Sequence, residues 1–320
     1  MRTNAMTIDV FPAETLVVTE GAGPGDPISF ADDLMLDDVY HLRAGAMTQE
    51  LGLLRENNSL HRADDVGNIV HLDSCLTLMG PDGSTHEVLI LVEVADGLAA
   101  AIFFLPLGEL SPDADYRLIG VERHAATRRF AEAACGSFAR GTHITLSDGR
   151  MVPIETLKVG DLILTRDAGT QPIRWIGQTT MRANGIFAPV VIAKGALHNE
   201  DDLVIRPDHR IFVYQREDRI GIGRAEVLIK ARHLINGTTV TRRSGGFIDY
   251  FQLIFDHHHI IYAEGISAES HLIDPRTRPA LPEGATQTDH GHQPHLDYEV
   301  QDQLIASAKA AALLRRASQG

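Results

Sequence analysis

Cysteine is scarce in this chain: the 320 residues include only Cys75 and Cys135. Two thiols could form one pair, but they cannot build the disulfide framework that stabilises small secreted domains. We therefore expect a protein that folds without disulfides in a reducing compartment.

Clustered positive charge is also missing. The formal net charge is −14, and Lys and Arg form no basic stripe along the chain. Binding to a phosphate backbone requires such a cluster, so the sequence predicts that nucleic acid is not a partner.

Long apolar runs are absent as well. The longest, roughly residues 97–107, is shorter than the ~18 residues that a membrane-spanning helix needs. The N-terminal residues MRTNAMTIDVFPAETL place acidic and polar side chains where a signal peptide has an apolar core. These features predict a soluble cytoplasmic protein without a membrane span, and they leave non-classical secretion open.

The chain does contain enough apolar residues, 44%, to bury two modest cores or one large one. Within residues 66–107, the runs CLTLM and HEVLILVEV flank the turn sequence PDGS, and a second turn at Ala95-Asp96-Gly97 precedes AAAIFFLPL. This pattern predicts a small β-rich domain over residues 1–121, whose role the sequence does not indicate.

The character of the sequence then changes twice. From Glu122 to Cys135 it is rich in Ala, Arg and Glu and lacks Gly and Pro, which favours a helical linker over residues 122–136. Beyond it, short apolar runs alternate with turn residues, as in HITL, SDGR, MVPIETL and KVGD, which predicts an all-β domain over residues 137–276. We expect a polar linker over 277–296 and an amphipathic helix over 297–318. The predicted fold class is therefore mainly β, with a C-terminal helix.

The second half of the chain resembles a known family. The segments SFARGTHITLSDGRMVPIETLKVGDLILTRDAGTQPIRWIG, RPDHRIFV and HHIIYAEGISAES are similar, in this order, to the bacterial Hint (Hedgehog/intein) family. This chain is a version that begins with Ser. The resemblance implies an autoprocessing domain over residues 137–276.

The resemblance also implies a site. In this family, the first residue attacks the carbonyl before it, which converts a peptide bond into an ester or thioester. Here Ser137 would attack the Gly136 carbonyl, and His209 would hold and protonate the departing nitrogen. One further His, either His258 or His259 by spacing, would lie near the reacting centre. Gly136 suits the scissile position because it lacks a Cβ.

The chain departs from the family pattern at several places. Ser137 stands where Cys is usual, and a hydroxyl ionises far less readily than a thiol. Arg206 replaces a Thr or Ser, so it either donates to the Gly136 carbonyl or marks lost activity. Glu269 and Ser270 replace the His-Asn pair that ends an intein, which predicts no splicing. Hedgehog domains carry an extra carboxylate that activates a sterol. The segment RWIGQTT contains no acidic residue for this role, so the sequence does not support cholesterol transfer.

The main hypothesis is therefore a single-turnover enzyme, a self-cleaving peptidase or acyl transferase that cuts between Gly136 and Ser137. Its substrate is its own N-terminal segment, its acceptor is open, and it needs no cofactor. The alternative is a Hint scaffold or binding module that breaks no bond. A metal-dependent hydrolase using residues 257–259 is disfavoured, because adjacent strand residues point to opposite faces, and we expect no metal.

Overall fold

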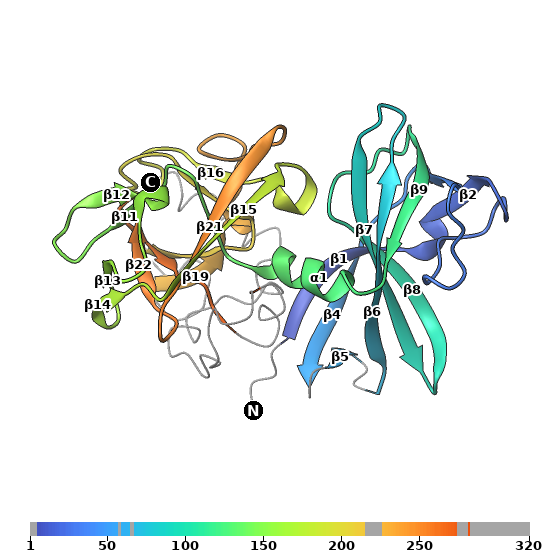
Figure 1. Cartoon of the computed structure of the whole chain (residues 1–320), viewed down its shortest axis with the longest axis horizontal. Helices are drawn as coiled ribbons and strands as arrows, with labels where there is room; N and C mark the ends of the chain where they lie inside the picture. Colours follow the sequence, from blue (N-terminus) through green and yellow to red (C-terminus); the bar gives the residue numbers. More distant parts are fainter. Residues whose placement is uncertain (1–4, 57–58, 65–66, 215–225, 274–280, 282–320) are drawn as a thin grey trace. The chain divides into compact units, whose positions relative to one another are not determined.

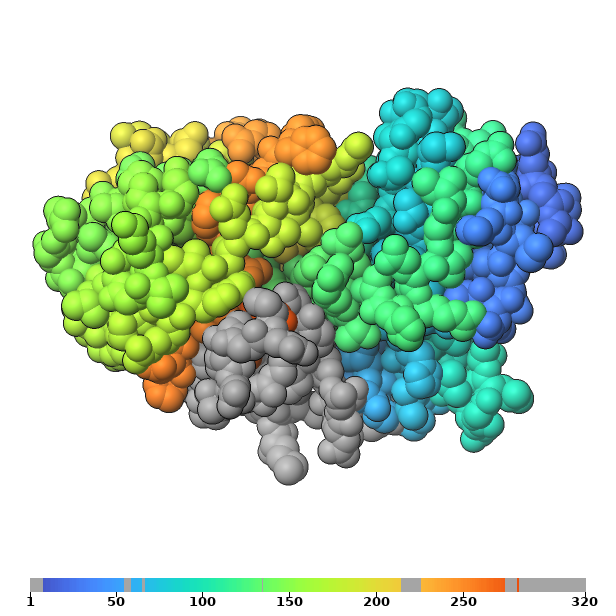
Figure 2. Space-filling view, viewed as in Figure 1, coloured from blue at the N-terminus to red at the C-terminus, as the bar shows by residue number. Residues whose placement is uncertain are grey.

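A computed structural model describes residues 5–56, 59–64, 67–214, 226–273 and 281. The fold is mainly β, as the sequence predicts (Figure 1). The chain divides into two compact units, Met1–Ala133 and Ala134–Gly320. The predicted linker over 277–296 and the predicted helix over 297–318 lie outside the described residues, apart from residue 281. Figure 2 shows the outer surface of the units, with the first in blue to green and the second in green to orange.

The first unit is built from nine described strands in one antiparallel sheet. They are β1 (Ala5–Pro12), β2 (Leu16–Glu20), β3 (Val39–Leu42), β4 (Gln49–Glu56), β5 (Ser59–Arg62), β6 (Ile69–Met79), β7 (Thr85–Ala95), β8 (Leu98–Pro106) and β9 (Asp115–Glu122). A short 3-10 turn, η1 (Ala13–Thr15), joins β1 to β2.

This sheet closes on itself. Its order is β2-β3-β9-β6-β5-β4-β1-β8-β7, and β6 also pairs with β7, which joins β6, β5, β4, β1, β8 and β7 in a ring. Asp96 and Gly97 both have positive φ, 51° and 79°, as the tight turn between β7 and β8 requires. Closure leaves few unpaired strand edges and encloses a core that includes Leu76, Ile90 and Phe104.

The α-helix of the described chain is α1 (Ala126–Ala134). It is shorter than the helical segment that the composition suggests, because β9 continues through Glu122 before the chain turns. Arg129 on this helix pairs with Glu87 of β7 and with Glu132. No helix among the described residues has the length and apolar character needed to cross a membrane.

The second unit consists of short strands and turns. They are β10 (Phe138–Ala139), β11 (His143–Thr145), β12 (Met151–Pro153), β13 (Leu162–Thr165), β14 (Gly169–Pro172), β15 (Trp175–Arg182), β16 (Val190–Ile192), β17 (Leu203–Ile205), β18 (Arg210–Tyr214), β19 (Glu226–Lys230), β20 (Val240–Arg242), β21 (Phe247–Ile254), β22 (Ile260–Ala263) and β23 (Ile266–Glu269), with 3-10 turns η2 (Ile154–Thr156), η3 (Gly185–Phe187) and η4 (Ala231–Leu234).

These strands form two sheets. The first has the order β15-β21-β10-β17-β16-β20, and the second has the order β12-β11-β22-β23-β18-β19, with β13 joined to β22 and β14 to β13. β10 brings the start of the unit into the middle of the first sheet, between β17 and β21. The residues just before β10 are therefore surrounded by strands from much later in the sequence.

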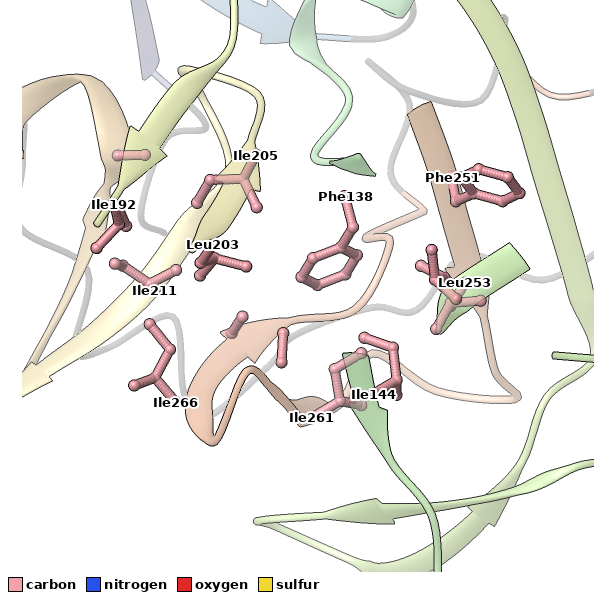
Figure 3. Packing of buried hydrophobic residues seen from close by; sticks show 14 of the residues in the cluster. Phe138, Ile144, Ile192, Leu203, Ile205, Ile211, Phe251, Leu253, Ile261 and Ile266 are labelled. Atoms are coloured by element: carbon pink, nitrogen blue, oxygen red, sulfur yellow. The ribbon is translucent and has the colours of Figure 1, made fainter. Parts of the chain in front are cut away.

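The core of the second unit lies between these two sheets (Figure 3). The first sheet contributes Phe138, Leu203, Ile205 and Leu253, and the second contributes residues such as Ile144, Ile211, Ile261 and Ile266. Burying a large apolar side chain stabilises the fold by about 1.5–3 kcal/mol, so this cluster holds the two sheets together. Phe138 is the member nearest in sequence to the predicted scissile bond.

Replacing Leu253 tests the importance of this core. Leu253 is fully buried, so Leu253→Ala should lower the free energy of unfolding of this unit by about 2–5 kcal/mol. Leu162→Ala is the matched control, because Leu162 is 49% exposed in the same unit and its truncation should cost about 0.5 kcal/mol or less. Urea denaturation followed by circular dichroism measures both. Equal losses would contradict the position of the core.

Candidate functional site

The predicted scissile bond lies at the entry to β10. Phe138 is opposite Ile205 of β17 on one side and opposite Phe251 of β21 on the other. The side chains of Phe138, Ile205 and Phe251 all belong to the buried core. Because successive side chains of a strand point to opposite faces, Ser137 points away from this core face.

Ser137 is held on that opposite face by both neighbouring strands. Its side chain is buried, with the residue only 1% exposed, and Gln252 Nε2 donates a hydrogen bond to Ser137 Oγ at 3.3 Å. On the other side, the backbone N–H of Arg206 donates to the Ser137 carbonyl at 3.1 Å. Ser137 is thus held just before β10 by two residues that lie more than 60 positions away in the chain.

His209 lies on the other side of the same backbone. Its ring packs against the Phe138 ring, with 4.3 Å between the ring centroids. A Cβ placed on Gly136 would lie 3.2 Å from His209 Nδ1 and 3.2 Å from Glu269 Oε1. The Gly136–Ser137 bond therefore has His209 and Glu269 on one side and the Ser137 hydroxyl with Gln252 on the other.

His209 is fully buried, and its pKa depends on this burial and on the charges around it. Burial lowers its pKa from the usual 6.5 to about 4, with Arg210 adding to this effect, while Glu269 and the carbonyls of Glu269 and Ser137 oppose it. Within the described part of the chain, neither ring nitrogen makes a hydrogen bond of standard geometry. His209 is therefore an uncharged imidazole at neutral pH, and it lies close to the Gly136–Ser137 peptide bond.

Glu269 ends β23 and is 2% exposed. The backbone N–H of Arg210 donates to Glu269 Oε1 at 3.0 Å, and Arg210 Nη1 lies 3.3 Å from Oε2. Burial disfavours the ionised carboxylate, but Arg210, His258 and His209 outweigh burial and hold the pKa of Glu269 well below its usual range. The site thus contains a buried negative charge at neutral pH.

The structure distinguishes the two candidate histidines near β22. His258 Nε2 donates to the Ser270 carbonyl at 3.1 Å and lies 3.5 Å from Glu269 Oε2. His259 instead contacts Asp167 on the β13–β14 turn, with 2.9 Å between Nδ1 and Oδ2. His258 therefore adjoins the carboxylate beside Gly136, whereas His259 joins the second sheet to that turn.

Arg206 lies on the same face as Ser137, since the two residues are opposite each other across β17 and β10. Its guanidinium stacks over the rings of Phe187 and Tyr250, at 4.8 Å and 5.5 Å from their centroids. Buried and stacked in this way, the cation carries its charge to the sheet face that holds the nucleophile.

Two residues of this site were not identified from the sequence as functional. Gln252 lies in an ordinary strand pattern of β21, and only the pairing of β21 with β10 brings it to Ser137. The sequence analysis noted Glu269 only because it stands, by resemblance, where inteins end in His-Asn. That difference pointed to the absence of splicing but not to a contact with the site. Its contacts with Arg210 and His258 come from the tertiary fold.

No cluster of three or more His, Cys, Asp or Glu side chains in the described ranges is arranged to hold a metal ion. The chemistry that the site offers is that of a hydroxyl, an imidazole and a paired carboxylate placed around a peptide bond of their own chain. Such groups carry out acyl transfer by nucleophilic attack and proton transfer.

The described part of the second unit thus consists of two β-sheets, with a buried hydroxyl, imidazole and carboxylate gathered around its first peptide bonds. The family model of the Hint domain matches residues 136–275, a range that begins at the glycine of the predicted scissile bond. Residues 136–275 thus form a Hint domain, as the sequence predicts. None of the curated proteins compared with it matches.

Solved structures of inteins are similar to this chain. The DnaB intein from Synechocystis sp. PCC 6803 is 14% identical, with a TM-score of 0.29, and the match covers 42% of this chain and 98% of the intein. The gp41-1 intein is also 14% identical, with a TM-score of 0.26, and the match covers 42% of this chain and 97% of the intein.

A side chain at position 136 should disturb this site. Gly136→Ala would place a Cβ 3.2 Å from both His209 and Glu269, so we expect a loss of about 1–3 kcal/mol in the stability of the domain. Gly120→Ala in β9 is a comparison, because its Cβ would meet only ordinary contacts at 3.4 Å. Thermal unfolding of each unit, followed by calorimetry, measures the effect. An unchanged domain in Gly136→Ala would contradict the close approach.

The lowered pKa of His209 predicts a dependence of stability on pH. Below pH 6.5, the unfolded chain binds a proton at this ring that the folded chain refuses until about pH 4, so acid favours unfolding across this window. The loss between these limits should be about 3 kcal/mol. In a Ser137→Ala background that stays intact, His209→Gln should remove this part of the slope in denaturation curves recorded from pH 7 to pH 4. Parallel slopes with and without His209 would show that its pKa is not lowered.

Proposed function

We propose that this protein processes itself by cleaving the Gly136–Ser137 bond through an N-to-O acyl shift. The observation that carries the proposal is the placement of this one peptide bond between the buried Ser137 hydroxyl and the His209 ring, inside a Hint domain. A buried serine with a purely structural role does not need a preceding glycine that lies against an imidazole and a carboxylate.

The first step exchanges one bond for another. Ser137 Oγ forms a bond with the Gly136 carbonyl carbon, and the bond from that carbon to the Ser137 nitrogen breaks. The hydroxyl loses its proton, the nitrogen gains one, and the product is an ester with a free amine. Because Ser137 Oγ and His209 lie on opposite sides of the backbone, attack and protonation of the leaving nitrogen occur from different sides.

His209 supplies the proton to the nitrogen in this mechanism. An amine leaves poorly without a proton, so a protonated imidazole beside it lowers the barrier. With a pKa of about 4, only a small fraction of His209 is protonated at neutral pH. Slow processing that accelerates as the pH falls toward 5 is therefore the expected behaviour.

Gln252 and Arg206 support the nucleophile. Gln252 Nε2 donates to Ser137 Oγ, which restricts the orientation of the hydroxyl and leaves its proton free to depart during attack on the Gly136 carbonyl. The Arg206 guanidinium, stacked over Phe187 and Tyr250, would supply positive charge on the sheet face of Ser137, which would favour the oxyanion formed during attack. Hydrolysis of the ester, or its transfer to an acceptor nucleophile, then separates residues 1–136 from residues 137–320.

Intact mass spectrometry tests the proposal directly. The full chain is incubated at pH 5, 6 and 7, with and without hydroxylamine, which opens esters. We expect a fragment that ends at Gly136, more of it with hydroxylamine and at lower pH, and none in Ser137→Ala or His209→Ala.

Two control variants keep the interpretation specific. Ser147→Ala removes an exposed hydroxyl, and His143→Ala removes an imidazole elsewhere in the same domain; both should cleave like the wild type. If the wild-type chain keeps its full mass under every condition, the Hint domain is a non-cleaving scaffold and self-processing is wrong.

A further inference from the structure

Glu269 is an unusual group to find beside a reacting peptide bond. It is a carboxylate with 2% exposure, and burying a charge is costly unless it is paired. Arg210 and His258 lie within 3.5 Å of its carboxylate oxygens, and the His209 ring lies nearby, beside Gly136.

The geometry joins Glu269 to His209. Glu269 Oε1 and His209 Nδ1 each lie 3.2 Å from the same point, the position of a Cβ on Gly136. The two residues are also held together by the backbone, because Arg210, which follows His209, donates its N–H to Glu269 Oε1 at 3.0 Å. This hydrogen bond links the Glu269 carboxylate to the backbone next to His209.

The charges near His209 act in opposite directions. Burial and Arg210 favour the neutral ring, whereas Glu269 favours the protonated ring, and His258 lies beyond Glu269 at 3.5 Å from Oε2. Of these ionisable groups, only Glu269 is negative. The proton that the leaving nitrogen needs is thus available on His209 to the extent that this one carboxylate allows.

We propose that Glu269 is a positioning residue for self-processing, which orients His209 and stabilises its protonated form while the Gly136–Ser137 bond breaks. This proposal rests on the function proposed above. The proton passes from His209 to the Ser137 nitrogen as the carbon–nitrogen bond breaks, and the proton lost by Ser137 Oγ restores the imidazolium through solvent. Glu269 itself neither gains nor loses a proton.

The position of Glu269 is consistent with this role and with the loss of splicing chemistry. Because Glu269 and Ser270 replace the His-Asn pair that ends an intein, this chain cannot cyclise an Asn. Its carboxylate instead acts through His209, which lies beside the Gly136–Ser137 bond. One end of the domain thereby assists the chemistry at the other end.

Substitution of Glu269 is the test, with matched variants. Glu269→Gln keeps the size and an oxygen for the Arg210 N–H, but removes the charge, and Glu269→Asp restores the charge. Glu264→Gln is the control, because Glu264 is equally buried in the same domain but pairs with His143. Circular dichroism and thermal unfolding establish that each variant is folded.

We expect Glu269→Gln to process about tenfold more slowly at pH 6, with the rise in rate on acidification displaced to lower pH by about one unit. Glu269→Asp should recover part of the rate, and Glu264→Gln should match the wild type. A folded Glu269→Gln chain with the wild-type rate and pH profile would overturn the proposal.

A second measurement separates this inference from the proposed function. In the Ser137→Ala background, no processing occurs, and the His209 ring is titrated by NMR from pH 7 downward. With Glu269 in place, we expect the ring to titrate near pH 4, and with Glu269→Gln to remain neutral to lower pH. An identical titration with and without Glu269 would reject the role of Glu269, even if the wild-type chain cleaves itself. If Glu269→Gln shifts the titration but the wild-type chain never cleaves, only the proposed function is rejected.

Discussion

The insertion of β10 between β17 and β21 is the constraint on which the site depends. Phe138 anchors this short strand in the core, where it packs among side chains of both sheets (Figure 3). A two-residue strand gains little from its own hydrogen bonds, so burial of Phe138 is what holds it. The Gly136–Ser137 peptide bond, one residue upstream of Phe138, then has a defined place, with Ser137 directed to one face and Gly136 close to His209 and Glu269.

Balance among buried charges is the second requirement. Glu269 remains ionised because Arg210 and His258 compensate for its burial, and His209 remains neutral because nothing compensates fully for its own. The same desolvation thus has opposite consequences for two neighbouring groups. A carboxylate and an imidazole whose environments drive their pKa values apart are a frequent basis of acid–base chemistry in proteins.

The departures from the family pattern have a common physical meaning. A serine hydroxyl is a weaker nucleophile than the thiol of the usual Cys, and under the proposed function the hydrogen bond from Gln252 to Ser137 Oγ and the stacked Arg206 would help to offset this difference. Glu269, which by the sequence resemblance stands where inteins end in His-Asn, lies close to Gly136.

Local sequence determined much of this protein. The turn at Asp96-Gly97 and the short apolar runs after residue 137 were sufficient to predict a mainly β fold, because turn chemistry and alternation act over a few residues. The Hint domain was predicted from the resemblance of the ordered motifs around Ser137 and His209 to a known family. The contacts of Gln252, His258 and Glu269 were decided only by the tertiary structure. Their strands lie more than 100 residues from Ser137, and register between such strands is set by the packing of the whole core rather than by any nearby pattern.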